Sequence, residues 1–334
     1  MKALVYTGVR EVELRDVPDP APMHDEVLVR VEAVGICGSD MHAWSGHDDR
    51  RPAPLVLGHE AAGTVVGGPM AGRRVTINPL VTCGRCAACI SGRDNLCTTR
   101  QIISMPPREG AFAELLAIPE RNLVTVPDDV SMTVASLAEP LACGWHAVRL
   151  AERVLDMPLA SARCLVIGGG AIGLGAALVL QSFGAAEIWL SEPSEERRRI
   201  AGSQGCIQTF DPSSQAAPSD IDLVIDGVGF GATRSAGSAA LRPGGVYMHI
   251  GLGDAGPGLD IRRTTLQELA FIGTYTYTAQ DFRETAQAIF DGRLGRLDWA
   301  EVLPLADGVG AFRRIADGKV AAPKVTLVPL ASPA

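Results

Sequence analysis

The apolar positions of the first 130 or so residues form short runs that are broken by Gly, Pro and Asp. Short runs bounded by such turn residues are typical of β-strands, since amphipathic helices need longer runs with a period near 3.6 residues. The sequence therefore predicts a β-rich first part. Its strands are expected over 2–6, 27–31, 61–66, 74–77 and 112–117.

From about Thr133 the pattern changes, first to helix and then to strands alternating with helices. Crossover helices are expected near 171–183, 194–203 and 231–240, between strands over 164–167, 187–190, 221–225, 245–250 and 270–274. This alternation predicts a doubly wound parallel sheet with helices on both faces. The fold class is therefore α/β with two domains.

After Thr278 the pattern predicts an amphipathic helix through Phe282, Ala286 and Ile289, a second helix near 308–317 and a strand over 324–328. These elements would crowd a doubly wound sheet, so we expect them to return to the first domain. The expected division is 1–139 for the β-rich domain, 140–275 for the parallel sheet and 276–334 for the returning segment.

Composition narrows the class of protein. The chain has 334 residues, 47% of them hydrophobic, which is enough for two cores. A net charge of −8 argues against binding to nucleic acid, which requires clustered Lys and Arg. The three lysines, Lys2, Lys319 and Lys324, leave no phosphate-binding Gly-Lys-Ser/Thr loop. With no signal peptide or long apolar segment, we expect a cytoplasmic protein that does not bind membranes.

Four of the eight cysteines are close in sequence, with the spacing C-x2-C-x2-C-x7-C: Cys83, Cys86, Cys89 and Cys97. Such a loop can surround one Zn²⁺ with four thiolates, a closed structural site. A disulfide framework is the weaker alternative because the chain is otherwise poor in cysteine, and an iron–sulfur cluster requires a different last spacing. We expect a structural zinc in loop 83–97.

A glycine-rich turn follows the first strand of the predicted parallel sheet. Gly168, Gly170 and Gly173 form G-x-G-x-x-G where this strand meets a helix, so the pyrophosphate of a dinucleotide would lie at the helix N-terminus, against Ala171 and Ile172. Glu192, at the end of the next strand, can accept hydrogen bonds from the adenosine ribose, which favours NAD. NADP stays open because Arg197, Arg198 and Arg199 follow. Two later strand ends, with Val228 and with Gly251-Leu252, are expected at the same crevice.

A second metal site with an open position is predicted from three separate motifs. They contribute the thiol of Cys37, the imidazole of His59 with the neighbouring carboxylate of Glu60, and the carboxylate of Glu139. A mixed ligand set of this kind can leave a coordination position for substrate, where Zn²⁺ acts as a Lewis acid on an alcohol or carbonyl.

In their order along the chain, these motifs resemble the zinc-dependent medium-chain alcohol dehydrogenases. Cys-Gly-Ser-Asp-x-His and Glu-Pro-Leu are similar to the polyol branch, which includes sorbitol and L-idonate dehydrogenases. The resemblance covers essentially the whole chain and implies a GroES-like catalytic domain and a Rossmann domain. It implies that Cys37 and His59 hold a catalytic zinc, with Glu60 beside it and Glu139 bound to it directly or through water.

The resemblance also implies roles for neighbouring residues. Ser39 would take the substrate proton and His42 would pass it to solvent, while Asp40 would orient His59. An edge strand near 246–252 would join subunits in a homodimer or homotetramer.

The chain departs from the sorbitol dehydrogenases at two polyol-binding positions, where it has Ala43 and Thr276. His47, Asp48, Asp49, Arg50 and Arg51 are candidate replacement contacts. The expected function is NAD-linked oxidation of a polyol, sugar or sugar acid to the ketone. Two alternatives stay open, an enzyme similar to L-threonine 3-dehydrogenase and a non-catalytic sensor or structural protein that binds NAD and zinc.

Overall fold

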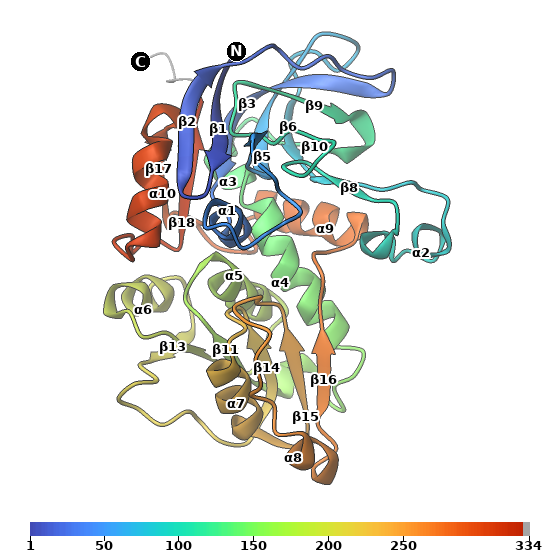
Figure 1. Ribbon diagram of the computed structural model, residues 1–334. Coiled ribbons are helices and arrows are strands. Elements are labelled where there is room, and N and C mark those ends of the chain that lie inside the picture. The colour runs from blue at the N-terminus through green and yellow to red at the C-terminus, as the bar shows by residue number, and fades with distance from the viewer. Residues whose placement is uncertain (330–334) are drawn as a thin grey trace.

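The computed structural model describes residues 1–329, which form two parts, each around its own large sheet (Figure 1). The strands of the upper part are β1 (Lys2–Gly8), β2 (Glu11–Asp16), β3 (Glu26–Gly35), β4 (Leu55–Val56), β5 (Glu60–Val66), β6 (Arg74–Ile77), β7 (Leu80–Val81), β8 (Gln101–Ile102), β9 (Leu115–Pro119), β10 (Leu123–Thr125), β17 (Ala300–Pro304) and β18 (Lys324–Val328). Its main sheet has seven strands, in the order β10-β6-β5-β3-β18-β17 with β9 also paired to β3. The β-rich first domain is thus confirmed.

The lower part has one six-stranded parallel sheet. Its strands are β11 (Arg163–Ile167), β12 (Glu187–Ser191), β13 (Ile207–Phe210), β14 (Ile221–Asp226), β15 (Leu241–His249) and β16 (Ala270–Gly273), in the order β13-β12-β11-β14-β15-β16. The chain winds outward from β11 in both directions, which confirms the doubly wound sheet.

Alternate residues of the strands enter different cores, because side chains of a strand point to opposite faces. Cys164 and Val166 join a core with α4 (Ala138–Ala151) and α5 (Ala171–Ser182). Leu165 and Ile167 enter the core on the other face. The remaining helices of this part are α6 (Glu195–Gly202), α7 (Gly231–Ala240) and α8 (Ile261–Leu266). Burial on both faces explains why these strands are almost continuously apolar.

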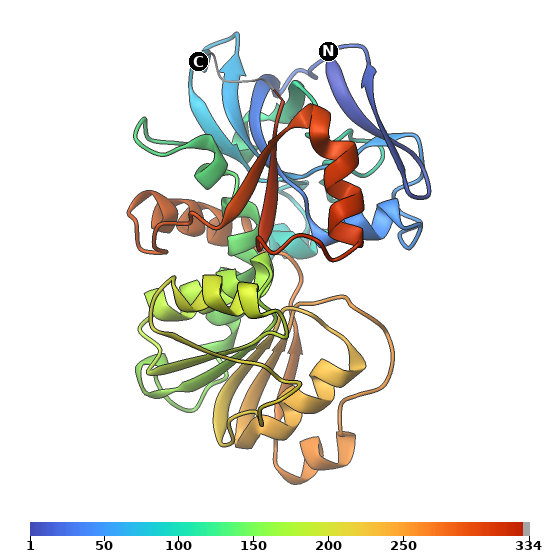
Figure 2. The same cartoon turned by 90° about the vertical axis from the view of Figure 1, so that its left-hand side faces the viewer.

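The end of the chain returns to the upper part (Figure 2). After α9 (Ala279–Phe290) come β17, α10 (Gly308–Ala316) and β18, and Thr326 and Leu327 of β18 pair with Gly35 and Val34 of β3. β17 runs parallel to β18 at the edge of that sheet. The upper part also contains the short helices α1 (Gly38–Trp44), α2 (Ala87–Ile90) and α3 (Met132–Ala135).

Some expected boundaries are wrong. The strand expected at 112–117 is β9 at Leu115–Pro119, because Phe112 is a fully buried core residue just before it. The strand expected at 246–252 as the sheet edge lies inside the sheet, since β15 has β14 on one side and β16 on the other. The two edge strands of the parallel sheet are β13 and β16. None of the helices within residues 1–329 is both long and apolar enough to span a bilayer.

Candidate active site

The structure brings Cys37, His59 and Glu60 together, with one donor atom from each within 4.8 Å of the others. Cys37 follows β3 and precedes α1, whereas Glu60 begins β5. β3 and β5 are antiparallel partners in which Gly35 is paired with Glu60. This pairing is why two motifs that are separated in sequence meet at one point.

Asp40 organises the loop that carries these donors. It is fully buried, and one carboxylate oxygen accepts a hydrogen bond from the Cys37 N–H (2.9 Å) while the other accepts from the Gly58 N–H (3.2 Å). The latter oxygen is 3.5 Å from Nδ1 of His59. Burial alone would raise the pKa of Asp40, but the adjacent His59 and Arg51 outweigh it and hold this pKa below its usual value.

Glu60 has a partner that the sequence analysis missed. Its Oε1 accepts a hydrogen bond from Nζ of Lys324 at 2.6 Å, and the same ammonium donates to the Ile36 carbonyl at 2.9 Å. Burial would lower the pKa of Lys324, yet the charges of Glu60 and Cys37 raise it above its usual value. The other oxygen, Oε2, is buried and accepts no hydrogen bond from residues 1–329. An unpaired buried carboxylate oxygen beside a thiol and an imidazole fits a divalent cation such as Zn²⁺.

Glu139 lies in the first turn of α4, buried, but outside the compact group of three donors. Its Oε1 accepts a hydrogen bond from the hydroxyl of Tyr277 at 2.6 Å. Burial raises the pKa of Glu139, against the opposing effect of nearby His59. Tyr277, a second residue that the sequence analysis missed, thus fixes where this carboxylate points.

Ser39 and His42 both lie on α1. Oγ of Ser39 is 3.5 Å from Nε2 of His59, while His42 is exposed. Nδ1 of His59 also has a partner that the sequence did not reveal, Oγ of Ser104 at 3.3 Å.

Arg51 is wrong as a candidate substrate contact. It is 4% exposed, and its guanidinium donates to Asp48 and to the Ser104 carbonyl, so it is an interior structural group. Arg50 remains exposed beside it.

The four cysteines of loop 83–97 form the second group, with all four sulfurs within 4.8 Å of one another. The Cys86–Cys89 and Cys83–Cys89 sulfur distances are 3.5 and 3.9 Å. A tetrahedron with Zn–S bonds of about 2.3 Å has S···S edges of about 3.8 Å, so these residues fit one zinc ion. The backbone N–H groups of Arg85 and Cys86 lower the pKa of Cys83 to about 6, which favours the thiolate that a metal requires.

The glycine turn has the geometry that a pyrophosphate site requires. Gly168 has φ +101°, and a Cβ on Gly173 would lie 1.8 Å from the Gly168 carbonyl oxygen, so the turn closes only with glycine. Gly170 caps α5, and a Cβ there would meet nothing within 4 Å. The free space at this end of α5 therefore lies beside Gly170, whereas the Ala171 N–H donates to the Pro323 carbonyl at 3.1 Å.

Glu192 lies at the C-terminal end of β12, where the sequence analysis expected it. Its carboxylate accepts hydrogen bonds from the Gly169 N–H (2.7 Å) and the Ser194 N–H (2.8 Å). Arg197 donates to the carbonyls of Val320 and Ala321, in the segment that precedes β18. Gly251 packs against Val228, and Leu252 is 72% exposed beyond it.

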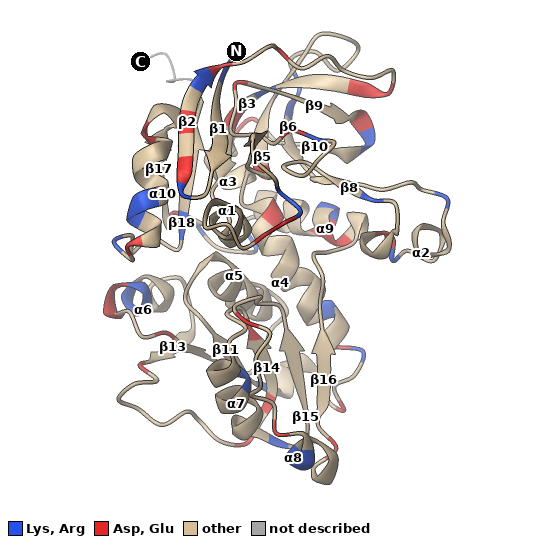
Figure 3. Cartoon of the chain, in the orientation of Figure 1, with Lys and Arg blue, Asp and Glu red and all other residues tan. Residues whose placement is uncertain are grey.

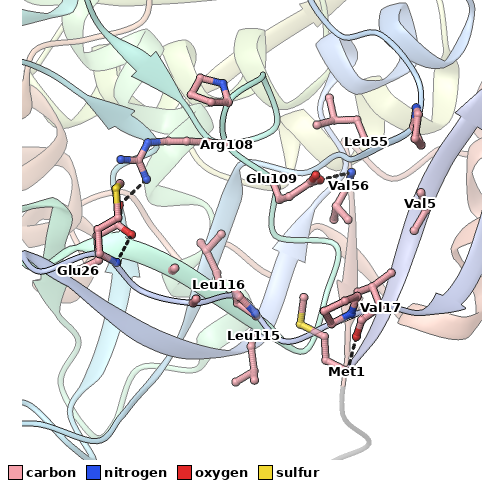
Figure 4. A pocket seen from close by; sticks show the side chains of 18 of the residues that line it. Met1, Val5, Val17, Glu26, Leu55, Val56, Arg108, Glu109, Leu115 and Leu116 are labelled. Carbon is pink, nitrogen blue, oxygen red and sulfur yellow. Dashed lines mark hydrogen bonds and ion pairs between the residues drawn. The ribbon is translucent and has the colours of Figure 1, made fainter.

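One cavity of about 320 Å³ joins the two groups of residues. From the upper part it is lined by Cys37, Glu60 and Lys324, and from the lower part by residues that include Gly168, Gly170, Ala171, Ile172, Gly173, Glu192, Arg197 and Val228. A larger cavity of about 710 Å³ lies among Met1, Val17, Leu116 and Arg108 (Figure 4). None of the candidate site residues lines it, so we assign the chemistry to the smaller one.

Comparison with known proteins agrees with this geometry. The family "Alcohol dehydrogenase GroES-like domain" matches residues 23–128, and "Zinc-binding dehydrogenase" matches residues 171–291. The chain is 30% identical over 342 residues to a probable D-xylulose reductase A of Neosartorya fischeri, covering 95% of this chain and 94% of that protein. It is 34% identical over 270 residues to a sorbitol dehydrogenase of Bacillus subtilis, covering 75% of each.

Among solved structures, L-idonate 5-dehydrogenase of Escherichia coli superposes with a TM-score of 0.87 at 26% identity, covering 98% of this chain and 97% of that one. These matches confirm the GroES-like and Rossmann domains and favour an oxidoreductase over the non-catalytic alternative. The chain belongs to the zinc-dependent medium-chain alcohol dehydrogenases, in their polyol branch.

Proposed function

We propose that this protein oxidises a secondary alcohol of a polyol, sugar or sugar acid to the ketone, with NAD as hydride acceptor and Zn²⁺ at the Cys37 site. The cavity that places Cys37 and Glu60 opposite Gly170 and Glu192 carries this proposal, because substrate and cofactor must meet there. The relatives named above act on compounds of this kind.

In this proposal Cys37 and His59 hold the zinc, with Glu60 beside it and Glu139 bound directly or through water. Held there, Zn²⁺ would supply Lewis-acid chemistry toward the substrate hydroxyl, and NAD would supply the hydride acceptor. Ser39 takes the proton of the substrate hydroxyl, and exposed His42 releases it to solvent. Asp40 holds the imidazole of His59 in place. Lys324 holds Oε1 of Glu60.

The cofactor site uses the space at the N-terminus of α5, where Gly168, Gly170, Ala171, Ile172 and Gly173 receive the pyrophosphate. Glu192 accepts the ribose hydroxyls, and its charge repels a 2′-phosphate. Val228, Gly251 and Leu252 border the nicotinamide side of the crevice, and Arg197 lies next to the ribose.

A substrate panel tests the proposal. Xylitol, D-sorbitol, L-idonate and L-threonine are incubated with NAD, and NADH formation is followed by absorbance. We expect a polyol or the sugar acid to be turned over faster than L-threonine. A preference for L-threonine would contradict the proposal and favour the alternative that the sequence left open.

Ser39→Ala should lower kcat by about a hundredfold, because general acid–base catalysis contributes 10²- to 10⁴-fold. The KM for NAD should stay within about twofold of wild type, since Ser39 lies outside the nucleotide turn. Steady-state kinetics measure both values. Ser45→Ala, at the end of the same helix α1, is the matched control. An unchanged kcat in Ser39→Ala would remove this residue from the proton path.

Glu192→Gln should raise the ratio of kcat/KM for NADP to that for NAD by about tenfold, since it removes like-charge repulsion at the 2′-phosphate. Glutamine keeps an oxygen for one of the two backbone N–H groups that Glu192 binds. Glu196→Gln, an exposed charge on α6, is the control and should leave the ratio unchanged. An equal ratio in Glu192→Gln and wild type would show that another residue selects the cofactor.

We further propose the domain limits 1–139, 140–275 and 276–334, supported by the pairing of β18 with β3.

A cytoplasmic homodimer or homotetramer is proposed in which β16 is the subunit edge, with Phe271 37% exposed on it. None of its eight cysteines, all within the described residues, forms a disulfide, which supports a reducing compartment. Segments with Lys or Arg and segments with Asp or Glu are interspersed over both parts in the view of Figure 3, which supports the proposal that the protein has no nucleic-acid or membrane partner.

A further inference from the structure

The four-cysteine loop contacts the chain segment that carries Tyr277. Nδ2 of Asn95, a buried residue, donates to the Tyr275 carbonyl at 2.8 Å. The two carboxylate oxygens of Asp94 accept from the Ala279 N–H at 3.2 and 3.1 Å. Both residues belong to the short 3₁₀ turn that ends just before Cys97, so they move with that ligand.

Arg100, three residues after the loop ends at Cys97, adds a third contact. Its guanidinium carbon is 4.6 Å from the centre of the Tyr275 ring, and Nε donates to the Tyr275 hydroxyl at 3.3 Å. Another nitrogen of this guanidinium donates to the Cys97 carbonyl at 2.9 Å. The loop therefore holds both ends of the segment 275–279. In Figure 1 this region is where α2 of the loop lies beside α9.

The middle of that segment has a conformation that is unfavourable by itself. Thr276 has φ +46°, a left-handed conformation that is costly for a β-branched residue, and its buried hydroxyl has no hydrogen-bond partner within residues 1–329. The next residue, Tyr277, is fully buried and donates to Glu139. Such a conformation persists only where surrounding contacts determine it.

Beyond its first residue, Ala279, the helix that follows is held by contacts that do not involve the loop. Asp281 of α9 accepts hydrogen bonds from Nδ1 of His146 (2.7 Å) and from Arg149 (2.8 Å), both on α4. The contacts made by the loop therefore fix the backbone of Tyr275–Ala279, and through it the direction of the Tyr277 side chain.

We propose that Asp94, Asn95 and Arg100 are positioning residues that act through Tyr277 on Glu139, so that the four-cysteine loop sets the geometry of the active site as well as stabilising its own domain. This inference rests on the proposed function, since it assigns Glu139 to the catalytic zinc.

The test is a double-mutant cycle with Asn95→Ala, Tyr277→Phe and the double variant in the zinc-loaded full chain. The first readout is the rate at which a chelator removes the zinc bound at Cys37, which requires no substrate. The second is kcat with xylitol and NAD. Zinc leaves the two sites at different rates, so its release to the chelator has two phases. Cys37→Ala lacks the phase that comes from the catalytic site, and it therefore identifies that phase in the other variants. Arg100→Met replaces Asn95→Ala if the latter does not fold.

Each single variant should release this zinc about tenfold faster and lower kcat about tenfold, as loss of an outer-sphere partner does. The double variant should be no worse than Tyr277→Phe alone, and the KM for NAD should be unchanged. Ser91→Ala is the control, because within residues 1–329 the hydroxyl of this loop residue bonds to the Ala88 carbonyl and to nothing in the segment 275–279. Additive effects, or an Asn95→Ala variant that behaves as wild type, would overturn the inference. If the zinc-release rates of the three variants show this non-additive pattern but no substrate is oxidised, the proposed function fails and the positioning role stands.

Discussion

Replacing Cys37 by alanine should lower kcat by about a thousandfold or more and remove one of about two zinc ions per chain. Cys37 supplies the sulfur donor of the group that also contains His59 and Glu60. Without it, the zinc would be left with the imidazole of His59 and the carboxylate of Glu60, which Lys324 already binds. The backbone N–H of residue 37 still reaches Asp40, so the loop should keep its shape. NAD affinity should be nearly unchanged, because the glycine turn is on the other side of the cavity.

Metal analysis measures the zinc content, NADH titration measures the cofactor affinity, and steady-state kinetics measure kcat. Cys206→Ala is the matched control, since that thiol is exposed and lies outside both cysteine groups. A Cys37→Ala protein with two zinc ions and normal turnover would place the catalytic metal elsewhere.

Lys324→Met should destabilise the metal-free protein by about 3–5 kcal/mol, because it leaves the carboxylate of Glu60 buried without its cation. Lys324 is 5% exposed and Glu60 is 1% exposed, so water replaces the lost partner poorly. Urea denaturation followed by circular dichroism measures the effect. Adding Glu60→Gln should recover most of the loss, since removing both charges leaves no unpaired ion.

Lys319→Met is the control for this prediction. Lys319 also forms an ion pair, with Asp317 at 2.8 Å, but both side chains are exposed. Exposed pairs contribute about 0–1 kcal/mol, so this variant should be close to wild type. If Lys324→Met and Lys319→Met lost equal free energy of unfolding, burial would not determine how much an ion pair contributes to stability.

The pattern of apolar residues predicted most of the fold because the parallel strands are buried on both faces. Val166 and Leu165 point into different cores, so the whole run around them must be apolar and is easily recognised. The strands that were missed are short, and some of them are partly polar. β13 contains Gln208 and Thr209, and β17 contains Glu301 and a proline. These segments form strands because they pair with neighbouring strands in the sheet. The β-propensity of their own residues does not include that contribution.

The candidate site could be predicted where ligands occur in recognisable motifs. Its supporting groups could not, because they come from remote parts of the chain. Lys324 lies 264 positions from Glu60, and Tyr277 lies 138 positions from Glu139. One signal was present in the sequence, since a lysine that opens the apolar run of β18 requires a buried partner. The residues of loop 83–97 that contact Tyr275 and Ala279, on either side of Tyr277, left no such signal.

The central claim is that hydride passes from a polyol carbon to NAD at the cavity shared by the two parts. Xylitol deuterated at both C2 and C4 tests this directly, because oxidation at either carbon then transfers deuterium; the reduced cofactor is analysed by mass spectrometry and the rates are compared with unlabelled xylitol. We predict that the reduced cofactor carries one deuterium per ketone formed and that Cys37→Ala forms none. Reduced cofactor without deuterium, or ketone formation that continues in Cys37→Ala, would contradict the account.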